Sequence, residues 1–218
     1  NSELLNDELD FEVENFNRQV ITENFNRTVL TEIARDIDPE NPEEQGKTLI
    51  YAVDDQHADT IVSILKEIYS ETGVDNDAIM KITGSVGGGN PKKVAEAIKR
   101  FKNERFPSIA VTVDLLTTGI DVPEITTLVF MRRVKSRILF EQMLGRATRL
   151  CSRIHKTHFE IYDPVGVYDS LEQVNTMKPV VTNPTTTFTQ LLDGLEEVEE
   201  KDVVQAQINQ IIAKLQRK

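Results

Sequence analysis

The stretch EQMLGRATRL, residues 141–150, brings together side chains that are suited to binding phosphate. Gln142, Gly145, Arg146 and Arg149 follow one another at spacings of three, one and three. Arginine stays charged, and its planar guanidinium matches the oxygens of a phosphate. If the stretch is helical, residues three and four apart share a face, and a glycine among them lets a ligand come close. The alternative is a solvated basic face that pairs with acidic residues elsewhere in the chain.

Charge is spread unevenly along the chain, whose formal net charge is −11. Residues 1–45 hold 13 acidic and 3 basic side chains, whereas residues 131–160 hold 8 basic and 2 acidic ones. The acidic total argues against a general nucleic-acid coat. A local basic surface can still attract phosphate, because electrostatic steering depends on where the charge lies.

The remaining composition excludes several classes of protein. Cys151 is the only cysteine, so no disulfide can form within the chain, and with three scattered histidines it gives no zinc-ligand spacing. No apolar run reaches the ~18 residues that span a bilayer, and the acidic first ten residues do not form a signal peptide. We therefore expect a cytoplasmic protein with no metal site of its own and no membrane partner. Because the chain begins at Asn1 without a methionine, we expect it to be part of a longer protein.

Short apolar runs alternate with amphipathic stretches over most of the sequence. They predict strands at 48–53, 78–83, 108–113, 126–131 and 157–163, and helices at 54–73, 91–101 and 136–147. This alternation is typical of an α/β domain with a parallel sheet covered on both faces, here over residues 45–165. Residues 1–44 are expected to form an acidic, partly helical segment. Residues 166–218 are expected to form a linker and an amphipathic C-terminal helix, which needs a partner surface.

Two loops that follow predicted strands carry further candidates, since ligands of open parallel sheets lie beyond the carboxyl ends of the strands. In the first loop, residues 112–123, Thr117 and the amides near Gly119 can donate to a phosphate. Asp121 can hold a ribose hydroxyl or a neighbouring arginine. The second loop, TGSVGGGN at residues 83–90, is either a glycine cradle for phosphate or a plain flexible connection.

Taken together, TLIYAVDDQHAD, VTVDLLTTGIDVP and EQMLGRATRL, in that order, resemble motifs IV, V and VI of superfamily 2 helicases. The Gln-x-x-Gly-Arg-x-x-Arg core after Gly-Ile-Asp-Val-Pro is the most specific part. The segments DLLTTGIDVPEI and EQMLGRATRLC resemble one group within this superfamily more closely, the motor (R, HsdR) subunits of type I restriction enzymes. This resemblance covers about residues 45–185.

The resemblance implies a RecA-like, three-layer α/β domain with flanking N- and C-terminal helices. In the family, ATP and Mg²⁺ sit between two such domains, and the first supplies the phosphate loop and the acidic metal motif. Neither motif occurs here, so the chain is expected to be the second domain and to be inactive alone. The resemblance assigns a catalytic role at the γ-phosphate to Arg146 and Arg149. It assigns the nucleotide side of the cleft to four further residues: Gln142, Gly119, Asp121 and Gly145.

For DNA contacts the resemblance is looser. Many relatives have a threonine and an arginine where this chain has Val113 and Thr118. Thr112, Thr117 and the Thr83–Gly84 turn are therefore the candidates for DNA contact. The implied function is ATP-driven translocation of double-stranded DNA before cleavage. The implied partners are the first RecA-like domain and the nuclease domain of the same subunit, together with the modification and specificity subunits.

Two other functions stay open on the sequence. The chain could be the second RecA-like domain of another superfamily 2 helicase, acting in DNA repair or on RNA. That assignment would be favoured if the parent chain carried no nuclease motif. The chain could also be a non-catalytic α/β module that binds a partner protein. That module would bind through the terminal helix, and this alternative would be favoured if Arg146 and Arg149 were buried in salt bridges within the domain.

Overall fold

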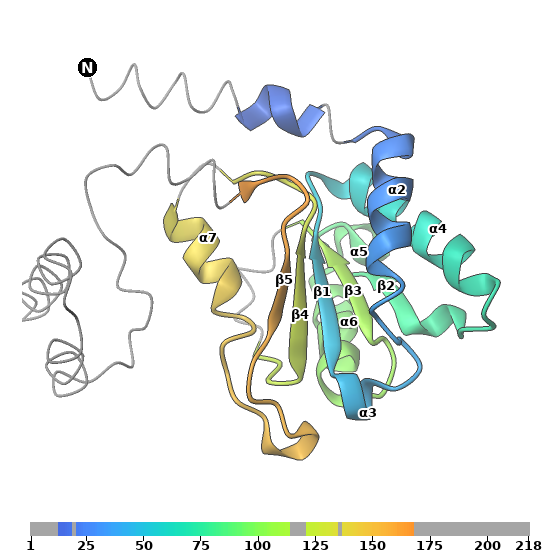
Figure 1. Cartoon of the computed structure of the whole chain (residues 1–218), viewed down its shortest axis with the longest axis vertical. Coiled ribbons are helices and arrows are strands. Elements are labelled where there is room, and N and C mark those ends of the chain that lie inside the picture. Colours follow the sequence, from blue (N-terminus) through green and yellow to red (C-terminus); the bar gives the residue numbers. More distant parts are fainter. Residues whose placement is uncertain (1–12, 19–20, 114–120, 135–136, 168–218) are drawn as a thin grey trace, which may run out of the picture. The chain divides into compact units, whose positions relative to one another are not determined.

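The computed structural model describes residues 13–18, 21–113, 121–134 and 137–167 (Figure 1). All of them belong to one compact unit that ends at Leu171. Thr117, Gly119, Ser136, and the predicted linker and C-terminal helix beyond residue 167 lie outside the described residues. No helix in the described part of the chain is long and apolar enough to cross a membrane.

The core of the unit is a five-stranded sheet in which every pair of neighbouring strands is parallel. The strand order is β2-β3-β1-β4-β5, so Leu49 of β1 pairs with Ala110 of β3 on one side and Leu128 of β4 on the other. All five predicted strands are confirmed, with these bounds: β1 (Lys47–Tyr51), β2 (Ile79–Lys81), β3 (Ile109–Thr112), β4 (Ile125–Phe130) and β5 (Glu160–Tyr162).

Helices surround this sheet, and their ends follow local sequence signals. Asp54 caps α4 by accepting a hydrogen bond from the backbone of His57, and Asn90 caps α6 by accepting one from Lys92. Pro91 occupies the first turn of α6, as predicted. The helices are α2 (Glu23–Ile33), α3 (Pro42–Gln45), α4 (Asp55–Ser70), α5 (Val86–Gly89), α6 (Pro91–Asn103) and α7 (Arg137–Leu144), with short 3-10 turns η1 (Asn76–Ala78) and η3 (Ser152–Ile154).

The two faces of the sheet carry separate apolar cores, because successive strand residues point to opposite sides. On one face Ile50 and Val129 pack with residues of α2 and α4, including Leu30 and Ile61. On the other face residues of α6 and α7 complete the core, which contains the following buried aromatic rings: Tyr51, Phe101, Phe130 and Phe140. Helices thus cover both faces of a parallel sheet, and the predicted three-layer α/β fold is confirmed (Figure 1).

The N-terminal segment contributes to this domain. Helix α2 packs against α4, and Asn26 is fully buried with its Oδ1 2.9 Å from Nε2 of His57. The helical residues 13–18 are tied to the segment after β4. The amide of Asn17 exchanges two hydrogen bonds with the backbone of Arg133, whose guanidinium lies 3.6 Å from the ring centre of Phe16. The boundary at residue 44 stays a prediction, but the acidic segment has definite contacts with the α/β domain.

Candidate functional site

Arg146 and Arg149 lie beyond helix α7. The prediction of a helix over residues 136–147, with both arginines on one face, is therefore wrong at its C-terminal end. Helix α7 ends at Leu144. The Gly145 N–H still bonds four residues back to Glu141, but the N–H groups of Arg146 and Ala147 bond three residues back to Met143 and Leu144. Such bonds tighten the last turn into a 3-10 type, and Gly145 is a poor helix former at the point where this happens. Arg146 thus lies in this turn and Arg149 in the stretch after it. The Tyr51 hydroxyl anchors the start of the turn by donating to the Met143 carbonyl at 3.2 Å.

Arg149 and Asp121 come together although 28 residues separate them in sequence. The Arg149 Nη1 donates to Asp121 Oδ2 in a close ion pair. Both side chains face solvent, with 61% of Arg149 and 43% of Asp121 exposed. Exposed pairs of this kind contribute only about 0–1 kcal/mol. An anionic ligand can therefore replace the carboxylate at little cost.

The other predicted nucleotide-side residues surround this pair less tightly. Gln142 is exposed on the last turn of α7, Gly145 is exposed after it, and Arg146 is half-buried. A Cβ on Gly145 would lie 3.4 Å from the carbonyl oxygens of Glu141 and Gln142, a tight contact that a small shift relieves. The described residues therefore do not explain the glycine by packing alone, and its role toward a ligand stays a prediction.

The structure gives little support to the threonines predicted to contact DNA. Thr112, the last residue of β3, has no exposed surface that a phosphate could reach. Thr83 is 4% exposed, and its hydroxyl donates to Oδ1 of Asp55 at 2.5 Å. Hydrogen bonds from Ser85, Thr83 and Lys81 lower the pKa of Asp55 to about 2, so a carboxylate stands where a phosphate was expected. Of this turn, only Gly84 offers exposed backbone.

Lys156 is a residue that the sequence did not single out. Its side chain is 8% exposed, and its ammonium donates to three backbone carbonyls: Pro123 at 3.0 Å, Ile125 at 2.5 Å and Ala147 at 2.7 Å. Burial lowers the pKa of Lys156, and the charges of Cys151 and Glu124 oppose this shift. A lysine in a basic stretch is typical of a solvated surface, so no sequence signal marks this one as buried.

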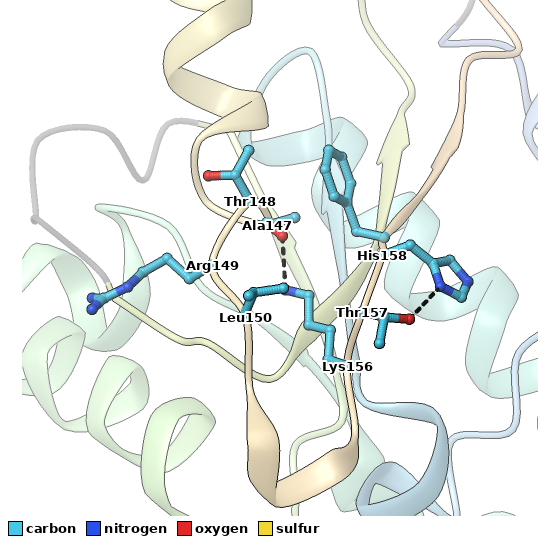
Figure 2. Close-up of a pocket in the computed structure, with 8 residues that line it drawn as sticks. Ala147, Thr148, Arg149, Leu150, Lys156, Thr157 and His158 are labelled. Carbon is cyan, nitrogen blue, oxygen red and sulfur yellow. Dashed lines mark hydrogen bonds between the residues drawn. The ribbon is translucent and has the colours of Figure 1, made fainter. Parts of the chain in front are cut away.

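Figure 2 shows the surroundings of this ammonium, a pocket lined by residues 147–150 and 156–159. The Lys156 side chain reaches back to the carbonyl of Ala147, whereas the Arg149 side chain extends away from the pocket (Figure 2). Near the pocket, Arg153 also pairs with Glu124 at 2.6 Å. Within the part of the chain that the structure describes, no group of histidine, cysteine, aspartate and glutamate side chains can hold a metal ion.

Arg149 and the Lys156 ammonium thus connect residues 147–149 to residues 121–125, the segment that leads into β4. Ile125 pairs with Lys47, the first residue of β1, so these contacts lie at the edge where the parallel strands begin. The connection between two parallel strands must carry the chain back to that edge. Arg146 and Arg149 follow α7, the helix of the connection from β4 to β5, which explains why they lie near the edge where the strands begin.

Comparisons with known proteins bear on the family and the fold of this chain. Residues 24–151 match the family described as helicase conserved C-terminal domain. The chain is 42% identical to the type I restriction enzyme EcoKI endonuclease subunit of Escherichia coli strain K12, over 99% of this chain and 19% of that subunit. It is 26% identical to the EcoAI endonuclease subunit of Escherichia coli, over 93% of this chain and 26% of that subunit. The chain therefore spans about a fifth to a quarter of the length of these curated relatives.

Solved structures extend the likeness to the fold. A fragment from Vibrio vulnificus YJ016, described as a presumed HsdR subunit of a type I restriction enzyme, superposes with a TM-score of 0.59. It is 28% identical, over 70% of this chain and 28% of that one. Domain 2 of the DEAD-box helicase Mss116p, bound to an RNA duplex, gives a TM-score of 0.53 at 18% identity, over 92% of this chain and 71% of that one. At that identity the likeness concerns the fold alone, and it confirms the expected RecA-like arrangement.

The family match runs from α2 to the residue after the arginine stretch and covers more than half of the chain. The chain belongs to the helicase conserved C-terminal domain family.

Proposed function

We propose that the chain is the second RecA-like domain of a type I restriction endonuclease subunit that moves duplex DNA by hydrolysing ATP. The observation that carries this proposal is the exposed Arg149–Asp121 pair, formed by the two motifs that the resemblance assigns to the nucleotide. The 42% identity to the EcoKI endonuclease subunit over 99% of the chain supports the choice of enzyme class. Translocation is proposed to precede cleavage, which belongs to a nuclease domain of the same subunit.

In this proposal Arg146 and Arg149 meet the γ-phosphate of a nucleotide held against the first RecA-like domain. Bound ATP supplies the phosphoryl group and the driving free energy. The arginines stabilise the negative charge that builds on the equatorial oxygens, an effect worth ~10³–10⁵ in rate for an arginine finger. Arg146 and Arg149 suit phosphate, and the described residues include no group of three or more histidine, cysteine, aspartate or glutamate side chains that could hold a metal ion. In line with the resemblance, the proposal assigns the Mg²⁺ ligands to the first domain.

The neighbouring residues have supporting roles. Asp121 holds the Arg149 guanidinium at the site and gives way to the phosphate, since both side chains are exposed. Gln142 and Gly145, exposed beside the arginines, line the nucleotide, and Gly119 is proposed to do the same. The proposed macromolecular partners are duplex DNA and the modification and specificity subunits. The DNA contacts at Thr117 and at the Gly84 backbone are part of this proposal.

The alternative of a non-catalytic interaction module has less support. It would be favoured if both arginines were buried in salt bridges, but Arg149 is 61% exposed. A role in another superfamily 2 helicase rests on shorter matches. One is 30% identity over 55% of the chain to the yeast protein described as ATP-dependent helicase IRC3.

The test is to replace Arg146 or Arg149 by alanine in the full-length subunit and to measure DNA-stimulated ATP hydrolysis with the melting temperature. Either change is expected to lower kcat roughly 10²-fold or more without loss of folding, because neither side chain fills a core cavity. Lysine should restore little, since it lacks the bidentate fork. Arg35→Ala is the matched control, because Arg35 is 67% exposed and pairs with Glu32, outside the arginine stretch and the segment 121–125. Turnover that stays intact in both alanine variants would remove the arginines from the catalytic machinery.

A further inference from the structure

Lys156 joins the two backbone segments on which the proposed arginine site is built. Ala147, whose carbonyl accepts from the ammonium at 2.7 Å, directly follows Arg146 and lies two residues before Arg149. Pro123, which accepts at 3.0 Å, lies two residues after Asp121. One nitrogen atom therefore connects the backbone of both arginines to the backbone of the carboxylate that pairs with Arg149.

A tight turn delivers this nitrogen to its place. The Lys156 N–H donates to the Cys151 carbonyl at 2.9 Å, and His155 adopts the left-handed conformation with φ of 52°. The chain thereby reverses between Cys151 and Lys156, and the lysine side chain points back along the stretch it has just followed (Figure 2). Three carbonyl acceptors require three N–H donors, which a lysine offers only as the ammonium.

Two other links join the same segments, but both lie at the surface. Arg149–Asp121 and Arg153–Glu124 involve arginine side chains that are 61% and 70% exposed, so salt and water weaken them. The Lys156 ammonium is almost fully buried and makes charge-assisted hydrogen bonds. Removing it would leave three carbonyl oxygens without this donor, and buried acceptors without a partner are costly. The Lys156 ammonium thus adds a buried polar link between the arginine backbone and residues 121–125, beside the apolar core that Ala147 shares with Val122 and Ile125.

We propose that Lys156 is a positioning residue for ATP hydrolysis, which fixes the turn carrying Arg146 and Arg149 against the segment carrying Asp121. This inference rests on the proposed function, because it assumes that the two arginines act on a phosphate. Lys156 acts through the arginine backbone and does not touch the nucleotide. Its loss is expected to affect turnover more than ATP binding, since a small displacement of a group that acts in the transition state costs rate.

Lys47 provides a matched control within the same domain. It is 3% exposed, and its ammonium also donates to three backbone carbonyls: Glu104 at 2.6 Å, Arg105 at 3.3 Å and Pro107 at 2.9 Å. Burial lowers its pKa to about 8. The described hydrogen bonds of its ammonium all go to residues 104–107, and none goes to the arginine stretch. Its backbone N–H donates to the Glu124 carbonyl at 2.8 Å, a bond that a change of the side chain leaves in place. Lys47→Met and Lys156→Met therefore remove the same kind of buried interaction, but only the second faces the arginines.

The experiment compares Lys156→Met, Lys47→Met and Lys156→Gln in the full-length subunit, by DNA-stimulated kcat and KM for ATP per folded molecule and by melting temperature. We expect Lys156→Met to lower kcat about 10-fold or more while KM changes less than about 3-fold. Lys47→Met is expected to lower the melting temperature by a similar amount and to leave kcat per folded molecule unchanged. Lys156→Gln, which keeps two donors, is expected to fall between the wild type and Lys156→Met, and it replaces Lys156→Met in the comparison if that variant does not fold.

A mutant cycle in the Arg146→Ala/Arg149→Ala background separates positioning from a general loss of structure. If Lys156 acts through the two arginines, its replacement should cost less than about 2-fold in kcat once both are already alanine. An equal loss of kcat in both backgrounds, or the same loss in Lys47→Met, would overturn the inference. A normal kcat in Lys156→Met together with a lowered kcat in Arg149→Ala would also overturn the inference, but the proposed function would still hold. Normal turnover in Arg146→Ala and Arg149→Ala would instead refute the proposed function itself.

Discussion

At the scale of single residues, the Arg149–Asp121 contact is where sequence and structure meet most closely. Both positions belong to recognisable motifs, and the structure brings their side chains together at the surface. The residues that hold the arginine turn in place are different in kind. No sequence motif marks Lys156 or the hydrogen bond from Tyr51 to the Met143 carbonyl. Both support the arginine turn only because the fold brings these groups together. Sequence patterns mark residues that face ligands, whereas support from buried backbone contacts appears only in three dimensions.

The pairing of Arg149 with Asp121 leads to a prediction for Asp121→Asn in the full-length subunit. Asparagine keeps an oxygen acceptor but loses the charge that holds the guanidinium, so Arg149 should be less well oriented and kcat should fall about 10-fold. The measurement is DNA-stimulated ATP hydrolysis in the single variants and in the Asp121→Asn/Arg149→Ala double variant. The double variant should be no slower than Arg149→Ala alone, and a further 10-fold loss would show that Asp121 acts independently of Arg149.

At the scale of elements, the alternation of apolar runs predicts every described strand of the sheet and the helices α4, α6 and α7 between them. It does not predict α5, because the glycine-rich residues 84–90 are typical of a loop. Strands β1 and β3 are buried at every residue, which is why their sequences are mostly apolar, with Lys47, Thr48 and Thr112 as the polar exceptions. The prediction failed where a helix ends. The stretch up to Ala147 has helical spacing, but the chain leaves α7 at Leu144, because the N–H groups of Arg146 and Ala147, which follow Gly145, form a tighter turn. The sequence predicts that Gly145 lets a ligand come close, and the structure shows that Gly145 also directly follows the last residue of α7.

The contact between α2 and α4 makes the stability of the fold depend on pH. Nδ1 of His57 accepts from the Val53 N–H at 3.1 Å, so the neutral ring carries its proton on Nε2 and can donate to Asn26. Burial lowers the pKa of His57 to about 4, against a smaller opposing effect of Asp54. Between about pH 4 and the ordinary value near 6.5, the unfolded chain thus binds more protons than the folded one. The stability from the neutral histidine is present above pH 6.5 and is lost as pH falls toward 4.

The test of this pH effect is urea unfolding of the chain at several pH values between 6.5 and 4.5. His57 is expected to contribute up to ~1.4 kcal/mol per pH unit to the loss of unfolding free energy. Carboxylates also titrate near the lower limit, so the comparison is between slopes in the wild type and in His57→Gln, which cannot titrate. The variant should be less stable at pH 7 but should show the shallower slope. Identical slopes would mean that His57 titrates alike in the folded and unfolded chains.

At the scale of the whole molecule, the chain has an α/β core of its own and, under the proposed function, supplies one side of a nucleotide site. The exposed arginines suit a phosphate, and no group of metal-binding side chains occurs among the described residues. We therefore predict that the purified chain has no measurable ATPase activity, with or without DNA. Any activity should be compared with that of the Arg149→Ala chain, since activity that persists there comes from a contaminant. Turnover that depends on Arg149 in the isolated chain would contradict the assignment to a second RecA-like domain.

The distribution of charge over the molecule leads to a prediction for DNA binding. The chain as a whole has a net charge of −11, yet residues 131–160 hold 8 basic and 2 acidic side chains. Two of those basic residues are engaged in packing, because Lys156 is buried and the Arg133 guanidinium stacks on Phe16 and bonds to the Val165 carbonyl. The remaining six can meet at most about six phosphates, so the slope of log K against log salt should be no steeper than about −5.

Binding to duplex DNA should therefore be weak, equal for unrelated sequences, and lost steeply as salt rises, because it rests on phosphate contacts. The measurement is fluorescence anisotropy of two labelled duplexes of different sequence across a salt series. Arg153→Ala removes one exposed cation without disturbing the core and should reduce the slope by about one if Arg153 leaves Glu124 for a phosphate. An unchanged slope would place Arg153 outside the DNA surface. Tight binding that is insensitive to salt would contradict the prediction itself, because binding of that kind rests on contacts with the bases and not on contacts with phosphates.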